Sequence, residues 1–115
     1  MSAGNYTWKI PQGTYQERIF TYKDAAGAAI DLTGLTARMQ IRPYKGSDTV
    51  MLSVTTENGG IVLGGTAGTI RVIILTAQTT LITSDGYYDI ELIDGSGEVD
   101  RVIEGAIKLN PEVTQ

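Results

Sequence analysis

The sequence predicts an all-β protein, an antiparallel immunoglobulin-like sandwich of about seven short strands. Three observations support this fold class. Thr, Ile and Val supply 35 of the 115 residues (15, 13 and 7), and β-branched side chains favour extended backbone. Apolar and polar residues alternate in several short stretches, most clearly over 35–42, as in a strand with one buried face. Fourteen glycines punctuate these stretches. We expect a single domain over residues 1–115.

In the first half of the chain, turn-forming residues separate the predicted strands. Residues 6–10 form a short strand that ends at Pro11, and residues 14–23 form a longer one in which Phe20 and Ile19 face opposite ways. After a turn at 24–27 and a brief segment at 28–31, the clearest strand covers 35–42. Its inward residues are Leu35, Ala37, Met39 and Ile41, and its outward residues are Thr36, Arg38, Gln40 and Arg42. A further strand covers 50–56, with Val50, Leu52 and Val54 inward.

In the second half, hairpins and one helical turn are predicted. Residues 61–63 pair with 69–75 across a glycine-rich loop, and residues 76–83 form one turn of α- or 3₁₀-helix. Residues 86–93 and 98–109 form a hairpin around Asp94-Gly95-Ser96-Gly97, a strong turn signal. We expect residues 111–115 to be a loose tail.

Composition narrows the possible functions. The chain has no Cys and no His, so it lacks the commonest general base and the usual transition-metal ligands. A net charge of −4 and a pI of about 4.6 disfavour non-specific binding to nucleic acid or to anionic membranes. No apolar stretch approaches the ~20 residues of a membrane span, and the N-terminus does not resemble a signal peptide. We therefore expect no cofactor, no nucleic acid and no membrane partner.

The turn at 94–98 is a weak calcium candidate. Asp94, Ser96 and Glu98 place oxygen atoms at alternate positions, as calcium loops do. The stretch lacks the further acids and the length of an EF-hand loop, so a plain hairpin turn is the favoured interpretation.

Three carboxylates lie close together in sequence, namely Asp85, Asp89 and Glu91. Paired carboxylates act as acid and base in glycoside hydrolysis, and Asp89 and Glu91 share one strand face. Carboxylates on the solvent face of a strand are expected without any catalytic role, however, and no aromatic cleft accompanies these. We expect a protein that is not an enzyme.

Aromatic and basic residues are the candidates for an interface. Tyr87 and Tyr88 are adjacent, so one faces the core and one faces solvent; the inward hydroxyl is expected to bond to backbone, as in a tyrosine corner. Tyr6, Trp8 and Tyr15 suit a contact surface, although the end of the core is the favoured position for Trp8. Arg38 and Arg42 are expected to line one sheet face, together with Arg71, and a solvated face is the ordinary explanation for these arginines.

Three passages carry a resemblance to a known family. They are Asp24–Gly27 with Asp31–Arg42, then Gly68–Val72, and finally Gly86–Leu92 with Asp94–Gly97, Arg101, Gly105 and Ile107. In this order they resemble the immunoglobulin-like N-terminal domain of phage baseplate upper proteins and related small phage tail and virion proteins. Together they span most of residues 14–109.

The resemblance implies a β-sandwich that builds multimeric phage parts and has no catalytic residues. The expected function is therefore a virion structural protein: a tail, baseplate, collar or fibre-base adaptor, or a capsid cement. The expected partners are other virion proteins and further copies of the chain, after synthesis in the host bacterial cytoplasm. The chain ends at Gln115 without a fibre-forming region, which favours a standalone subunit. The alternative is a carbohydrate- or receptor-binding module of a phage fibre, in which outward tyrosines stack on sugars.

Overall fold

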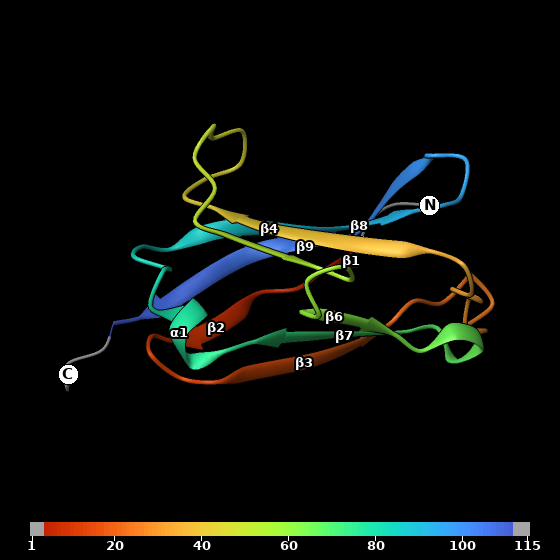
Figure 1. Cartoon of the computed structure of the whole chain (residues 1–115), viewed down its shortest axis with the longest axis horizontal. Helices are drawn as coiled ribbons and strands as arrows, with labels where there is room; N and C mark the ends of the chain where they lie inside the picture. The colour runs from red at the N-terminus through yellow and green to blue at the C-terminus, as the bar shows by residue number, and fades with distance from the viewer. Residues whose placement is uncertain (1–3, 112–115) are drawn as a thin grey trace.

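The computed structural model describes residues 4–111, which form two facing β-sheets (Figure 1). The nine strands within these residues are β1 Gly4–Asn5, β2 Trp8–Pro11, β3 Gln16–Thr21, β4 Thr36–Arg42, β5 Leu52–Thr55, β6 Ile61–Leu63, β7 Thr69–Ile74, β8 Gly86–Ile93 and β9 Val99–Asn110. A 3₁₀ turn, η1 (Gly65–Ala67), and a one-turn helix, α1 (Thr76–Thr79), flank β7. The predicted all-β sandwich is confirmed.

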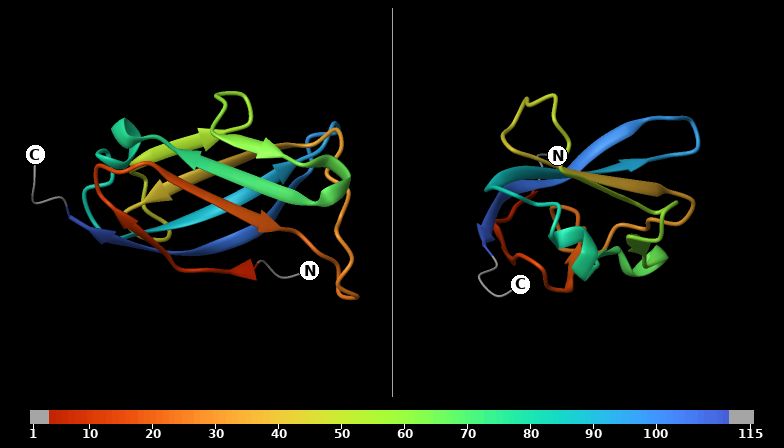
Figure 2. Two further views of the ribbon diagram at one scale, coloured as in Figure 1. Left: turned by 90° about the horizontal axis from the view of Figure 1, so that it is seen from below. Right: turned by 60° about the vertical axis from the view of Figure 1, so that its left-hand side comes forward.

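The strand order of the two sheets is compatible with that of an immunoglobulin-like sandwich. The large sheet runs β9-β8-β4-β5, with β1 and β2 both paired to the outer edge of β9, and the small sheet runs β3-β7-β6. These orders match the G-F-C-C′ and B-E-D sheets of variable-type domains. Seen from below, the small sheet lies in front of the large one and their strands cross obliquely (Figure 2), as the twist of packed sheets requires.

Residues 4–111 contain nine strands rather than about seven, and one of the additional strands lies at the N-terminal edge. One strand was predicted at 6–10, whereas β1 and β2 are two short pieces that both run parallel to β9. The strand does not stop at Ile10, before Pro11. Pro11 is itself part of β2, as its last residue, and lies opposite Asn110. A proline is tolerated there because β2 is an edge strand, where no ladder hydrogen bond from Pro11 is required.

The alternation along β4 places residues as predicted. Ala37, Met39 and Ile41 are buried in the core between the sheets, and the residues between them face outward. On β5, Leu52 and Val54 are also buried, but the inward prediction for Val50 is wrong. Val50 is 39% exposed because it precedes β5, in the loop that leads to that strand.

A β-bulge interrupts the β8–β9 pairing. Ile90 lies opposite Ile103 and Glu91 lies opposite Arg101, so Val102 is an extra residue on β9. Val102 and Ile103 are both buried, although successive strand residues normally point to opposite faces. The extra residue reverses the alternation, and Arg101 therefore lies on the outer face of the large sheet with Glu104.

Tyr88 is the inward member of the tyrosine pair, 1% exposed. Its hydroxyl donates a hydrogen bond to the backbone carbonyl of Tyr6 at 2.8 Å. The predicted bond to backbone is confirmed, but it is not a tyrosine corner, because the acceptor lies on the N-terminal edge segment rather than a few residues upstream. Burial raises the pKa of Tyr88 to about 12.

The one-turn helix predicted within 76–83 is α1, whose Gln78 side chain accepts a hydrogen bond from the Leu75 backbone N–H at 2.8 Å. No helix in residues 4–111 is long and apolar enough to cross a membrane. Of the predicted tail, Pro111 is exposed, and residues 112–115 lie outside the described residues.

Candidate functional site

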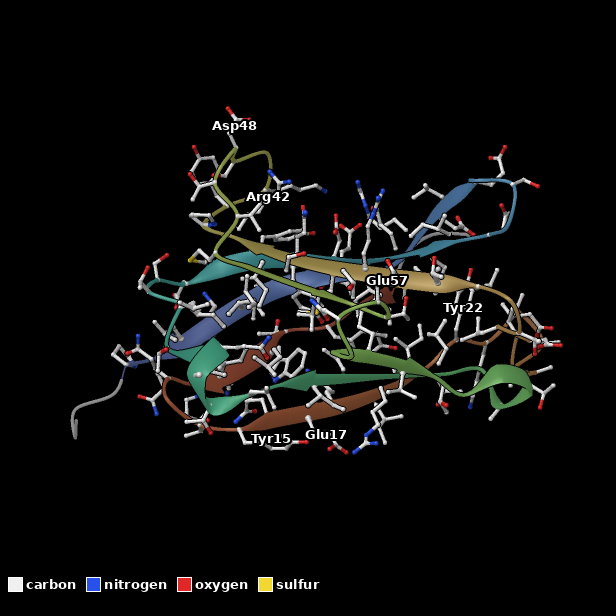
Figure 3. All side chains as sticks on the ribbon, viewed as in Figure 1. Tyr15, Glu17, Tyr22, Arg42, Asp48 and Glu57 are labelled. Carbon is white, nitrogen blue, oxygen red and sulfur yellow. The ribbon has the colours of Figure 1, made fainter. Side chains whose placement is uncertain are left out.

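The outer face of the large sheet carries a hollow of about 520 Å³. Its floor is the outward side of β4, β8 and β9, and its wall is the loop of residues 43–51, which stands up from the sheet (Figure 1). Asp48 lies at the outer tip of this loop and Arg42 lies below it (Figure 3). We call this feature the large-sheet hollow. Residues that line it are Arg38, Gln40, Arg42, Tyr44, Lys45, Gly46, Ser47, Asp48, Tyr87, Tyr88, Asp89, Glu91 and Arg101.

Short-range bonds hold the wall in place. The Arg42 guanidinium donates to the Ser47 backbone carbonyl and, at 2.7 Å, to the Gln40 side-chain oxygen. The Ser47 N–H donates to the Tyr44 carbonyl at 3.1 Å, and Ser47 itself is 4% exposed. Gly46 has a φ of +91°, a backbone conformation that side chains with a Cβ rarely adopt. The loop is therefore a defined turn beside the hollow.

Ion pairs cross the floor from strand to strand. Arg38 on β4 contacts Glu91 on β8, with 2.8 Å between Nε and Oε1. Arg101 on β9 lies between two acids, 3.3 Å from Asp89 and 3.8 Å from Glu104. The longer distances at Arg101 show that this guanidinium is less tightly paired than that of Arg38. Opposite charges in neighbouring strand positions stabilise the face modestly.

Glu104 on β9 contacts Tyr87 of the floor and Lys45 of the wall. Its carboxylate accepts a hydrogen bond from the Tyr87 hydroxyl at 2.6 Å and lies 3.4 Å from the Lys45 ammonium. The Tyr87 hydrogen bond is the main reason that the pKa of Glu104 is lowered, and the same bond raises the pKa of Tyr87. The Lys45 ammonium also lies 5.4 Å from the centre of the Tyr87 ring, so it covers that ring by a cation–π contact.

Asp89 is a carboxylate of the hollow whose surroundings disfavour its charged form. Burial raises its pKa, and the nearby Glu91 carboxylate raises it further, while Arg101 lowers it. The net direction is upward, which means that Arg101 does not fully compensate the desolvation of this carboxylate. Groups with raised pKa values in a hollow are typical of functional sites, although structural networks produce them as well.

The structure divides the predicted interface residues between core and surface. Trp8 is buried, with its ring edge-on to Phe20 and Tyr88; it therefore closes the core. Tyr88 is buried as well, at 1% exposure, so its side chain belongs to the core although the residue borders the hollow. Tyr6 and Tyr15 are 45% and 50% exposed. Tyr87, Arg38 and Arg42 meet in the hollow.

The prediction that Arg71 shares a face with the other two arginines is wrong. Arg38 and Arg42 lie on β4 of the large sheet, whereas Arg71 lies on β7 of the small sheet. Among the three carboxylates, Asp89 and Glu91 share one face of β8, as predicted, and both line the hollow. Asp85 precedes β8, accepts the Leu109 N–H at 2.8 Å and lies outside the hollow lining.

The calcium candidate has the structure of a hairpin turn. The Asp94 carboxylate accepts hydrogen bonds from the backbone N–H groups of Ser96 and Glu98, at 2.8 and 3.0 Å. Gly97 takes a φ of +84° in the same turn. Within residues 4–111, no cluster of three acidic side chains is suited to a metal ion. The hairpin turn therefore accounts for the positions of Asp94, Ser96 and Glu98.

Among the residues that sequence reasoning missed are Tyr44 and Arg101, which line the hollow, and Glu104, which contacts the lining residues Tyr87 and Lys45. Tyr44 is 65% exposed at the rim and lies between the predicted strands 35–42 and 50–56, where no alternation of apolar and polar residues marks it. The outward position of Arg101 could have been predicted, because two successive apolar residues in an alternating strand, Val102 and Ile103, indicate a bulge. Glu104 could have been placed from the same shift in alternation.

A second surface lies on the outer side of the small sheet. We call it the small-sheet face; it consists of Glu17, Ile19, Val62, Arg71 and Ile73. Ile19 and Val62 flank Arg71 in the strand register, and they are 58% and 48% exposed. Arg71 forms an ion pair with Glu17 at 2.9 Å. Glu17 points away from the large sheet (Figure 3). This face is more apolar than the floor of the large-sheet hollow.

No protein-family model and no curated protein matches the chain.

Proposed function

We propose that the protein is a non-enzymatic structural subunit of a phage or prophage virion, acting by association with its own copies and with other virion proteins. The sandwich fold agrees with the one that the resemblance implies. The passages that carry the resemblance supply core positions such as Met39 and Ile90 and turns such as 94–97. They support a shared architecture, and the association itself must be argued from a surface.

The observation that carries association is the small-sheet face. Ile19 and Val62 expose apolar side chains on either side of Arg71, where a monomer gains nothing from them. The acid Glu17 lies beside the base Arg71. Because one face presents both charges beside exposed apolar side chains, a second copy turned through a two-fold axis can meet complementary charges together with apolar surface.

The test is the concentration dependence of the molecular mass, measured by light scattering and sedimentation velocity. The wild type is expected to form oligomers as the concentration rises. Val62→Lys and Ile19→Lys should shift the association to higher concentration, because each buries a charge in the contact. Val99→Lys is the matched control, since Val99 is equally exposed, at 47%, but lies on β9.

A monomer at every concentration would contradict self-association through this face, and so would an equal effect of Val99→Lys. The virion assignment has a separate test. Genes for tail, baseplate or capsid proteins are expected on either side of the gene for this chain. Unrelated metabolic neighbours would contradict the virion assignment and leave the association result standing.

A second candidate function, a carbohydrate- or receptor-binding module of a phage fibre, is favoured by the large-sheet hollow. It combines an exposed tyrosine, Tyr44, with cross-strand pairs of donors and acceptors. Ligand pockets typically combine a shaped concavity with a few convergent polar groups. This candidate uses the opposite side of the sandwich from the small-sheet face, so both activities are compatible in one protein.

A further inference from the structure

We infer that the large-sheet hollow binds a neutral saccharide, with the Tyr44 ring stacking on a sugar ring and the Asp89–Arg101 pair contacting its hydroxyl groups. This inference rests on the second candidate function and specifies its site and its ligand class. A saccharide hydroxyl both donates and accepts hydrogen bonds, so it can donate to the Asp89 carboxylate while another hydroxyl accepts from Arg101.

The charge balance of the hollow favours a neutral ligand. Its basic residues each have an acidic or carbonyl partner: Arg38 pairs with Glu91, Arg101 with Asp89, Lys45 with Glu104, and Arg42 with the Ser47 carbonyl. An anionic ligand would meet Asp89 and Glu91, and a cationic ligand would meet the guanidinium groups. A neutral polyhydroxylated ligand can form hydrogen bonds to the acidic and the basic groups alike and brings no charge that either group repels.

Arg101 has donors to spare for a ligand. Its contacts with Asp89 and Glu104, at 3.3 and 3.8 Å, are longer than a good charge-assisted hydrogen bond. A guanidinium has five N–H donors in a fixed fork, and these two loose contacts do not use them all. A ligand hydroxyl in the hollow can therefore bond to Arg101 without breaking a strong existing bond.

The bulge at Val102 is an independent indication that Arg101 is placed for a contact. Without this extra residue, Arg101 would share the inward side of β9 with Ile103 and Gly105; with it, Arg101 lies beside Asp89. Bulges next to functional sites commonly re-aim one side chain in this way. The same bulge interrupts the ladder on the floor of the hollow, where regular pairing would be more stable.

Tyr44 is the ring available for stacking. It is 65% exposed at the rim, whereas the Tyr87 ring is already covered by the Lys45 ammonium. The bond from Arg42 to the Ser47 carbonyl holds the turn that carries Tyr44. Because the turn is formed before any ligand arrives, little ordering is needed on binding.

The experiment is a printed array of neutral and acidic oligosaccharides, followed by titration of the strongest neutral ligand by calorimetry. Tyr44→Ala and Arg101→Ala should each weaken binding by about tenfold or more, which is the loss expected for one good contact. Tyr44→Phe should retain binding, because the stacking ring remains. Lys108→Ala is the matched control: Lys108 is an ion-paired cation on the same strand, outside the hollow lining.

The outcomes separate the site from the function. Binding of neutral saccharides that Tyr44→Ala and Arg101→Ala weaken, but Lys108→Ala does not, supports the inference. Neutral binding that both site variants leave unchanged overturns the site and keeps the binding-module function. Binding of acidic glycans alone overturns the ligand class. No binding above background overturns the inference and the second candidate function together, and leaves the virion-subunit proposal untouched.

Discussion

A Cβ atom on Gly105 would lie 1.9 Å from the Tyr6 carbonyl oxygen and 2.7 Å from the carbonyl carbon. The N-terminal edge segment and β9 thus approach each other at a distance that only glycine permits. Two hydrogen bonds join the same place: the Tyr6 N–H donates to the Glu104 carbonyl at 3.0 Å, and Tyr88 donates to the Tyr6 carbonyl. The edge that residues 4–11 form along β9 depends on this contact.

Gly105→Ala is therefore expected to destabilise the fold. The added methyl group must displace the backbone at Tyr6, which costs about 1–3 kcal/mol, as overpacking commonly does. The measurement is the free energy of unfolding in urea. Gly95→Ala is the control, because a Cβ at Gly95 meets nothing within 4 Å. Equal stability of the two variants would show that the N-terminal segment can shift at no cost.

Tyr88→Phe tests the buried hydroxyl and its pKa. Loss of the bond to the Tyr6 carbonyl should lower the free energy of unfolding by about 1 kcal/mol at pH 7. Burial raises the pKa of Tyr88 in the folded protein to about 12, above the usual 10. Between these values the unfolded chain releases the proton and the folded protein keeps it, so stability falls as the pH rises from 10 to 12.

Urea unfolding at pH 8 and pH 11 measures this effect. The loss of stability on going to pH 11 should be smaller for Tyr88→Phe than for the wild type, because the variant lacks the titrating hydroxyl. Tyr44→Phe, at an exposed position, should lose as much stability as the wild type. An identical alkaline loss in all three proteins would rule out a raised pKa at Tyr88.

Asp89 and Asp31 should respond to pH in opposite directions. Burial raises the pKa of Asp89, so this carboxyl costs stability as the pH rises through its folded pKa. Hydrogen bonds from Thr33 lower the pKa of Asp31, so its contribution is present at neutral pH and is lost on acidification. At pH 7, Asp89→Asn should leave the unfolding midpoint unchanged or raise it, and Asp31→Asn should lower it.

The same pair of variants separates stability from function. If Asp89 is kept for ligand contact, Asp89→Asn should weaken saccharide binding while the fold remains at least as stable. Thermal unfolding at pH 4 and pH 7, together with calorimetric titration, measures both quantities. A marked loss of stability in Asp89→Asn would mean that the Arg101 contact outweighs burial, contrary to the direction of the pKa.

Arg18 is expected to stabilise the cluster of aromatic rings at Tyr6, Trp8 and Phe20. Its guanidinium carbon lies 5.1 to 5.8 Å from the ring centres of Tyr6, Trp8 and Phe20, and it donates to the Thr7 carbonyl at 3.1 Å. Arg18→Ala should lower the free energy of unfolding by about 1 kcal/mol or more. Arg71→Ala, which removes an exposed ion pair, should have a smaller effect in the same urea assay.

Sequence reasoning succeeded where a local pattern corresponds to one structure. The alternation over β4 identified the buried side of the strand, and the turn at 94–97 identified the β8–β9 hairpin. It failed at the N-terminal edge, where β1 and β2 run parallel to a strand about a hundred residues away. No local pattern specifies such a partner, and the role of Gly105 follows only from the approach of Tyr6.

By itself, the sequence determined the fold class, most strand positions and the division of Tyr87 and Tyr88 between surface and core. These depend on side-chain periodicity and turn residues, which act over a few positions. Only the tertiary structure decided that Tyr44, Asp89 and Arg101 share one hollow, and that Arg71 lies on the opposite sheet. The physical reason is that sheet order, which no single segment specifies, determines which strands and faces meet.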